Sequence, residues 1–433
     1  AWSSDNSIEA GKVRLERLGY FKEVSVETVP VPGTDDQIDV LYSVEEETTG
    51  SLGGNIGYSD FGLMLGFNLQ EQNFLGSGNT VGIGINKSIY NEVYNISFLD
   101  PYATKDAVSL GYNIYFRETD YGEFNIANYL TNSAGFGAQF GYPISDTQRL
   151  SFNITYDKTD IDIGSLPARE IYDFVATEGS IFETLSAGMS WQTVTLNRGL
   201  FPTDGASTAL SLSTTVPGSD LSYYRVNLRQ RYYQPLSSDL IFGFQGELGY
   251  LSAYGETEET PFFQNFYAGG PRSLRGFESN TLGPRSTDAP CYEFNYEEAT
   301  CPNLIDADGD GELDSPYYNP YANNTSRYRD PPIGGNIKVE GSLQLIFRLP
   351  FIEDQRSMRS AFFFDFGNVF SDNCKDYQIN CYKPSIDDLR YSYGVGITWI
   401  TGFGPMSFAI SKPTNAGPQE RTEEFQFTVG NVF

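Results

Sequence analysis

Histidine is absent from the 433-residue sequence, and only four cysteines and four methionines occur. The missing histidine removes the side chain that most often serves as a general base and as a zinc ligand. No nucleophile–base pair, phosphate-binding glycine loop or catalytic carboxylate pair stands out from the acidic background. The sequence therefore predicts a protein that is not an enzyme and that requires no cofactor.

Positive charge and long apolar runs are also scarce. The chain has 28 Lys and Arg against 56 Asp and Glu, a formal net charge of −28. Nucleic-acid binding needs clustered positive charge, so this balance argues against a nucleic-acid partner. We find no run of about 18 apolar residues, the length that a membrane-spanning helix requires.

The four cysteines form two close pairs, Cys291 with Cys301 and Cys374 with Cys381. Neither pair has the CxxC spacing of a metal or redox site. We expect two disulfides, each closing a small loop, which indicates an oxidising compartment.

From Gly50 to Phe433 the residues alternate with the period of two that is typical of β-strands. In one segment the apolar face carries Ile337, Val339, Leu343, Leu345, Phe347 and Leu349, and the opposite face is mostly polar. Such segments run for about 10 to 15 residues, longer than most strands of soluble sandwiches. Aromatic residues cluster near their ends, as in the interfacial girdles of membrane barrels.

The connections between these segments indicate a barrel. Short turns alternate with connections of mixed length, and the long connections all fall in the same alternating class: 158–178, 253–333, 371–387 and 413–422. Short turns on one rim and long loops on the other are typical of transmembrane β-barrels. Counting the segments predicts a 16-stranded antiparallel barrel over residues 48–433, with its first strand near 50–59 and its last at 423–433. The even count places both termini on the short-turn rim.

Residues 1–47 have a different pattern. A helix capped near Ser3 and ended by Gly19 is followed by two strands, Phe21–Val29 and Gln37–Val44. One helix and one hairpin are too small to form a core of their own. We therefore expect this segment to be part of a separate small α/β domain.

One acidic loop has the spacing of a calcium site. Carboxylates occupy positions 1, 3, 5 and 9 and a glycine occupies position 6, as in loops whose side chains converge on one hard cation. Position 12 is Tyr317 where such loops carry Glu, so a solvated acidic loop tip is the alternative. The candidate ligands are Asp306, Asp308, Asp310 and Asp314.

Four motifs occur in an order and at spacings that resemble the BamA family of bacterial outer-membrane barrels. They are Leu274-Arg275-Gly276-Phe277 in the long loop, Phe363-Phe364-Asp365-Phe366-Gly367, the Gly404-Pro405 turn, and a terminal strand that ends on Phe433. Residues 1–47, with Arg17-Leu18-Gly19-Tyr20-Phe21, resemble the second half of a POTRA domain, the periplasmic module that precedes such barrels. The resemblance implies that the first half lies upstream of Ala1.

The resemblance also implies an anchor inside the barrel. The long loop, 253–333, is expected to fold into the lumen, where Arg275 meets acidic groups on the inner wall. Alternation places Asp365 on that inner face. Gln344 stands where a second acidic partner is expected, so Glu340 or Glu247 is the alternative partner.

The first and last strands predict a weak seam. Gly53, Gly54 and Gly57 flank Asn55 in the first strand, and Gly430 lies near the end of the last. Glycine offers no side chain to pack across strands. We expect few hydrogen bonds there, so the first strand can act as a lateral gate that pairs with a client strand. For the last strand the seam residues are Thr428, Gly430 and Phe433, and a disulfide from Asn55 to a residue near Thr428 is expected to lock it.

The family resemblance implies a function in folding and inserting other β-barrels. The implied partners are unfolded barrel clients, periplasmic assembly lipoproteins, the lipid bilayer and lipopolysaccharide. A related autotransporter-assembly or two-partner-secretion barrel, a passive porin and a soluble β-rich adhesin remain as alternatives.

Overall fold

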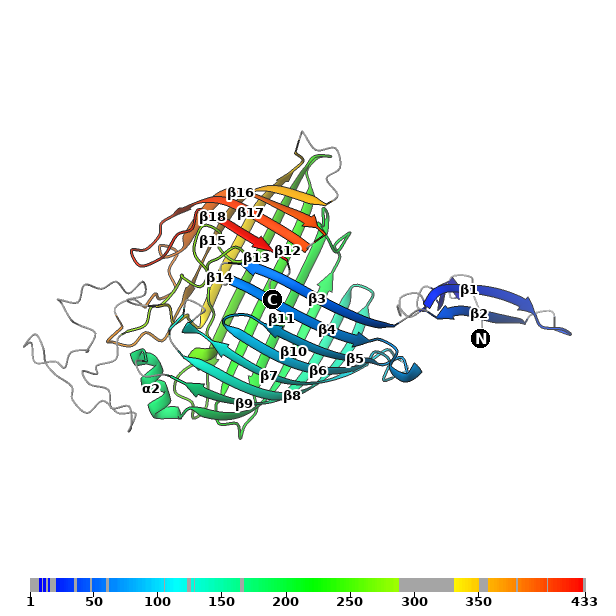
Figure 1. Cartoon of the computed structure of the whole chain (residues 1–433), viewed down its shortest axis with the longest axis horizontal. Coiled ribbons are helices and arrows are strands. Elements are labelled where there is room, and N and C mark those ends of the chain that lie inside the picture. The colour runs from blue at the N-terminus through cyan, green and yellow to red at the C-terminus, as the bar shows by residue number, and fades with distance from the viewer. Residues whose placement is uncertain are drawn as a thin grey trace, which may run out of the picture.

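The computed structural model consists of a barrel and a separate hairpin (Figure 1). It describes residues 21–34, 37–46, 49–59, 62–104, 106–122, 126–127, 129–163, 167–287, 331–349, 357–378, 381–402 and 404–430, with residues 8, 9, 11, 12 and 15. Within these ranges, none of the helices combines the length and the apolar character needed to cross a bilayer.

The hairpin is formed by β1 (Phe21–Pro30) and β2 (Ile38–Glu46). The barrel strands are β3 (Gly50–Ser59), β4 (Gly62–Glu71), β5 (Thr80–Lys87), β6 (Asn91–Asp100), β7 (Ser109–Asp120), β8 (Leu130–Ser145), β9 (Gln148–Asp162), β10 (Ile181–Val194), β11 (Gly205–Thr215), β12 (Tyr223–Pro235), β13 (Leu240–Ala253), β14 (Ile337–Phe347), β15 (Met358–Phe370), β16 (Arg390–Thr401), β17 (Gly404–Thr414) and β18 (Phe425–Val429). Short helices in the described parts of the connections are η1 (Phe74–Gly76), α2 (Arg169–Glu178) and η3 (Phe262–Gln264).

Each barrel strand is antiparallel to its neighbours, and β18 returns to β3 to close a ring of 16 strands. The predicted 16-stranded antiparallel barrel is therefore confirmed. The hairpin lies beyond the rim where β3 begins, which we call the N-terminal rim, whereas α2 lies at the opposite, loop rim (Figure 1). Turns such as 146–147 and 236–239 lie at the N-terminal rim, and the connections that join β13 to β14 (254–336), β15 to β16 (371–389) and β17 to β18 (415–424) leave and re-enter the barrel at the loop rim.

The pleat of the strands sorts side chains between lipid and lumen. In β15, Phe362 and Phe364 are about half exposed on the outer face, while Phe363 and Asp365 are buried on the inner face. The same alternation leaves Leu52 and Ile56 of β3 exposed on the outside. An outer apolar surface with a polar inner wall is the arrangement of a transmembrane barrel.

The packed core lies inside the barrel near the loop rim. One cluster joins residues of the 254–336 loop, among them Leu274 and Phe277, to Leu251 of β13 and Val369 of β15. A second cluster contains Ile171 and Phe174, which lie three residues apart on one face of α2 and pack against Phe262. The 254–336 loop and α2 therefore fill part of the lumen with apolar side chains.

Several predicted features lie outside the described residues. They are the cysteines Cys291 and Cys301, the carboxylates Asp306, Asp308, Asp310 and Asp314, the terminal Phe433, and most of the helix predicted before residue 20.

Candidate functional site

The sixth loop-rim connection, residues 254–336, reaches the inner wall through three glycines. Gly269, Gly270 and Gly276 have φ angles of +104°, +105° and +90°, a region that favours glycine. A Cβ atom at Gly276 would lie 3.1 Å from the Ser411 hydroxyl oxygen and 3.3 Å from the Ser392 Cβ. The backbone of the motif therefore lies directly against β16 and β17.

Arg275 is held by Asp365 through two parallel hydrogen bonds, which we call the anchor. Its Nε donates to Oδ2 and its second guanidinium nitrogen to Oδ1, each at 2.7 Å, and its backbone N–H donates to Oδ2 at 3.2 Å. The guanidinium carbon lies 3.4 Å from the ring centroid of Phe363. Asp365 has no exposed side-chain surface and Arg275 only 16%. Bidentate pairing and ring stacking at one site favour Arg over Lys.

The other predicted lumen residues surround the anchor without sharing it. Arg275 also donates to the Ser342 hydroxyl at 3.0 Å, and the Gln344 amide donates to that same hydroxyl at 3.3 Å. Glu340 accepts from the Ser273 hydroxyl and lies 3.0 Å from the Lys338 ammonium.

Glu247 is likewise engaged elsewhere. Its carboxylate accepts from the Asn227 amide at 2.8 Å and lies 3.2 Å from Arg229 and 3.5 Å from Lys338. The alternative in which Glu340 or Glu247 replaces a missing acidic partner of Arg275 is therefore not what the structure contains. The position of that partner is served by the Ser342 hydroxyl.

Gln426 of β18 is a site residue that the sequence reasoning missed. It is 2% exposed. Its Oε1 accepts from the Gly276 N–H at 3.1 Å, and its Nε2 donates to the Phe277 carbonyl oxygen at 2.8 Å. Phe277 also forms an isolated antiparallel bridge with Thr422. The motif thus connects β15 to the last strand.

The seam between β18 and β3 is held by little pairing. Within the described residues, β18 pairs with β3 at one position, Val429 opposite Tyr58, but pairs with β17 at five positions. On its other side, β3 pairs with β4 along its whole length. Among the described residues, the first strand therefore has one edge paired along its length and one edge with a single ladder partner.

Gly430 marks a change of backbone direction at the last described residue of the chain. Its φ of +75° turns the chain out of the strand conformation. Its N–H donates to the Pro405 carbonyl oxygen at 2.8 Å, and a Cβ at this position would collide with the Ile56 carbonyl oxygen. Only glycine lets the chain turn here while its backbone lies against β3.

The register corrects one prediction about this seam. Because Val429 lies opposite Tyr58 in an antiparallel pair, Thr428 is four positions away from facing Asn55. The error arose because the register across a barrel closure depends on the stagger of all the strands, which local alternation does not define. A cross-link has to join positions 58 and 429.

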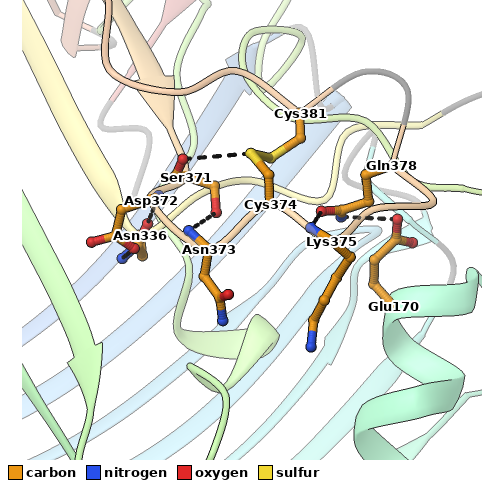
Figure 2. Close-up of a disulfide and its surroundings, with 9 residues drawn as sticks. All are labelled: Glu170, Asn336, Ser371, Asp372, Asn373, Cys374, Lys375, Gln378 and Cys381. Atoms are coloured by element: carbon orange, nitrogen blue, oxygen red, sulfur yellow. Dashed lines mark hydrogen bonds between the residues drawn. A yellow bond between two sulfur atoms is a disulfide. The ribbon is translucent and has the colours of Figure 1, made fainter.

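A disulfide between Cys374 and Cys381 shapes the connection 371–389 beside α2 (Figure 2). Gln378 donates to Glu170 of α2 at 3.0 Å, and the Tyr377 hydroxyl donates to Asp173 at 3.0 Å. Burial, together with the charges of Glu170 and Asp173, raises the pKa of Tyr377, so this hydroxyl stays neutral and donating at ordinary pH. The predicted Cys374–Cys381 disulfide is confirmed, and it holds the loop against α2.

Fold and site together define a class of protein: a transmembrane 16-stranded barrel with a loop anchored in its lumen and a sparsely paired seam. A family model described as the Omp85 superfamily domain matches residues 73–433. The chain belongs to the Omp85 superfamily.

Named relatives agree with this assignment. The chain is 30% identical to the outer membrane protein assembly factor BamA of Neisseria meningitidis serogroup B, over 99% of this chain and 52% of that protein. It is 24% identical to the mouse sorting and assembly machinery component 50 homolog, over 90% of this chain and 74% of that protein. It therefore spans about half the length of the curated BamA relative.

Solved structures show the same fold. The crystal structure of BamA from Haemophilus ducreyi lacking POTRA domains 1–3 superimposes with a TM-score of 0.81 at 29% identity, covering 100% of this chain and 79% of that one. CdiB from Acinetobacter baumannii gives a TM-score of 0.55 at 12% identity, covering 96% of this chain and 66% of that one, which is a likeness of fold alone.

Proposed function

We propose that this protein folds and inserts other β-barrel proteins into the bacterial outer membrane, and that clients enter at the seam. The observation that carries the proposal is that, within the described residues, β18 and β3 pair at a single position. Relatives named as assembly factors support it.

The seam provides the physical basis. An unpaired backbone group in hydrocarbon costs several kcal/mol, so a strand edge facing lipid is strongly driven to find a partner. The edge of β3 along Gly53, Gly54 and Gly57 offers backbone donors and acceptors with few side chains in the way. A client strand can satisfy these groups by β-augmentation, so hydrogen bonds are exchanged and no covalent bond has to change.

The anchor complements the seam. With Arg275 and Asp365 joined in the lumen and Leu274 and Phe277 buried, the sixth loop stays packed inside the barrel. A passive porin needs an open lumen and a fully paired seam, whereas here the sixth loop places a packed cluster in the lumen and the described part of β18 pairs with β3 at one position. The porin alternative is therefore disfavoured on structural grounds.

The proposal also includes the domain that precedes the barrel, its partners and its membrane. The hairpin β1–β2 is the end of a POTRA domain on the periplasmic side, and its partners are unfolded clients and periplasmic assembly lipoproteins. The bilayer and lipopolysaccharide surround the barrel. We also propose that the acidic loop Asp306–Asp314 binds calcium, which can be tested on the purified protein.

The test is a reversible lock across the seam. Tyr58→Cys with Val429→Cys joins directly opposed positions. The matched control, Ile410→Cys with Phe425→Cys, joins opposed positions of β17 and β18, which are already paired. Insertion of a radiolabelled barrel client into liposomes is measured for both. We expect the seam lock to abolish insertion until reductant is added and the control lock to leave it unchanged. Normal insertion by the locked seam would exclude lateral entry.

A further inference from the structure

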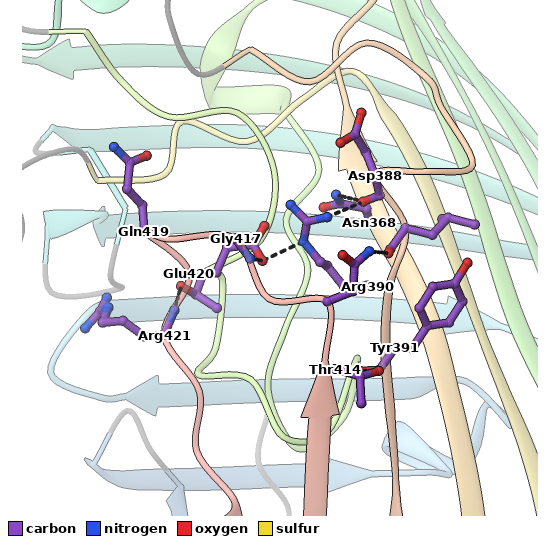
Figure 3. Close-up of polar contacts among 12 residues, drawn as sticks. Asn368, Asp388, Arg390, Tyr391, Thr414, Gly417, Gln419, Glu420 and Arg421 are labelled. Carbon is purple, nitrogen blue, oxygen red and sulfur yellow. Dashed lines mark hydrogen bonds and ion pairs between the residues drawn. The ribbon is translucent and has the colours of Figure 1, made fainter.

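We propose that Arg390 and Glu420 are positioning residues that set the register of β18, and through it the register of the seam. The inference rests on the proposed function, in which a client meets the seam. It assigns a task to two residues outside the anchor. The two side chains form a buried pair at the loop rim (Figure 3).

The pair closes the connection between β17 and β18. Arg390, the first residue of β16, donates through Nε to Glu420 Oε2 at 2.6 Å, and the side chains are 6% and 0% exposed. The same Oε2 accepts from the Gly417 N–H at 2.7 Å, and the Glu420 N–H donates to the Gly417 carbonyl oxygen at 3.1 Å. Glu420 thus folds residues 417–420 into a turn and fixes that turn to β16.

The arginine is itself held in place. A second guanidinium nitrogen donates to the Asp388 carbonyl oxygen at 3.0 Å, and the Asn368 amide of β15 donates to that same carbonyl at 2.6 Å (Figure 3). The guanidinium carbon lies 5.5 Å from the ring centroid of Tyr382. Glu420 is therefore attached to a point that β15 and β16 define together.

The sixth loop contacts the same connection from the lumen side. Arg285 donates to the Gln419 carbonyl oxygen at 2.9 Å, and Arg421 lies 2.7 Å from the Glu278 carboxylate. The Glu423 N–H donates to the Gly276 carbonyl oxygen at 2.9 Å. These contacts reach into the segment that leads directly to Phe425, the first residue of β18.

β18 needs such a fixed starting point because its own ladder specifies its position weakly. In the part of the chain that the structure describes, it has five pairs with β17 and one with β3. In a hairpin the register is set by the connection, and a long connection sets it only if it is itself rigid. A slip by two residues keeps Phe425, Phe427 and Val429 on the lipid side, so the apolar pattern does not oppose it. The Arg390–Glu420 pair opposes it by fixing the turn at 417–420.

The experiment measures register by cross-linking in the isolated folded barrel, without a client. Tyr58→Cys with Val429→Cys reports the native register, and Tyr58→Cys with Phe427→Cys reports a slip of two. Each pair is combined with Glu420→Gln or with the control Glu424→Gln. The control removes a carboxylate from the same hairpin, where Lys412 and Glu424 form an exposed pair at 2.7 Å.

We expect Glu420→Gln to raise the ratio of slipped to native cross-link about tenfold, which corresponds to about 1.4 kcal/mol. The control should leave the ratio unchanged because an exposed ion pair contributes little. Only barrels that keep their heat-modifiable gel mobility are counted. If Glu420→Gln does not fold, Glu420→Asp carries the same comparison.

Equal ratios for Glu420→Gln and Glu424→Gln would overturn the proposal. Client insertion by the same variants separates it from the proposed function. A shifted register with slower insertion supports both. A shifted register with normal insertion upholds the positioning role and counts against entry of clients at the seam.

Discussion

Replacing Arg275 by alanine leaves the buried carboxylate of Asp365 without its ion-pair partner. Asp365 accepts three hydrogen bonds from Arg275, two of them from the guanidinium, and the Arg275 side chain is 16% exposed. Removing one partner of a buried ion pair costs roughly 3–5 kcal/mol, because the remaining charge stays buried without compensation. We expect Arg275→Ala to lower the free energy of unfolding by that amount.

Arg275→Lys isolates the contribution of the planar guanidinium. Lysine keeps the charge but cannot donate two parallel bonds to both carboxylate oxygens while lying over Phe363. The loss of one charge-assisted hydrogen bond corresponds to roughly 1.5–3 kcal/mol. Lysine should therefore fall between arginine and alanine. Arg272→Ala, three residues earlier on an exposed part of the same loop, is the matched control.

The assay is urea unfolding of the barrel in detergent micelles, followed by tryptophan fluorescence and by the heat-dependent gel shift. Adding Asp365→Asn to Arg275→Ala should recover part of the lost stability, because no unpaired charge then remains. If Arg275→Ala and Arg272→Ala have equal effects, the anchor has no special role. A failure of Asp365→Asn to recover stability would refute the charge argument.

Three further predictions concern the loops. Replacing Cys374 and Cys381 by serine removes a constraint that contributes roughly 2–3 kcal/mol in the chain-entropy model. We expect limited proteolysis to cut the connection 371–389 faster in this variant while the barrel stays folded. Equal cleavage rates in the variant and the unmodified protein would contradict this. In a non-reduced digest Cys291 should be found paired with Cys301, and cross-loop pairing would contradict that. Calorimetric titration with calcium should give a binding signal that the double change Asp308→Asn plus Asp310→Asn removes. If the unmodified barrel gives no heat, the acidic loop does not bind calcium.

Local patterns were enough to predict the barrel and the inward position of Asp365, whereas the expectation that Arg275 meets an acidic group in the lumen came from the resemblance to the BamA family. Alternation defines which side chains face inward, so Asp365 could be placed on the lumen wall from Phe362, Phe364 and Phe366 alone. The glycines around Arg275 indicated a backbone that passes close to another surface. Both arguments need only residues that are near one another in the sequence.

Contacts that depend on distant segments could not be predicted in the same way. Gln426 meets Gly276 across 150 residues, and Gln378 meets Glu170 across 208. The sequence marks Gln426 only as an inward polar position, which many residues share. The pairing of Arg390 with Glu420 spans 30 residues but requires the turn at 417–420. The misassigned partner of Asn55 has the same origin, since barrel closure sets the seam register.

The last strand, β18, is held in place by side-chain contacts in addition to strand pairing. Such contacts can keep a strand ordered beside a weakly paired seam. A strand in an ordinary barrel is held by ladders on both edges, but within the described residues β18 has five pairs on one edge and one on the other. Gln426, bonded to the sixth loop, and Glu420, bonded to β16, hold it instead from the lumen and from the loop rim. Both groups contact β18 away from its edge with β3, so they do not depend on the ladder between the two strands. In the proposed function, stability would then come from the lumen and the loop rim, and hydrogen bonds would be exchanged on the lipid side.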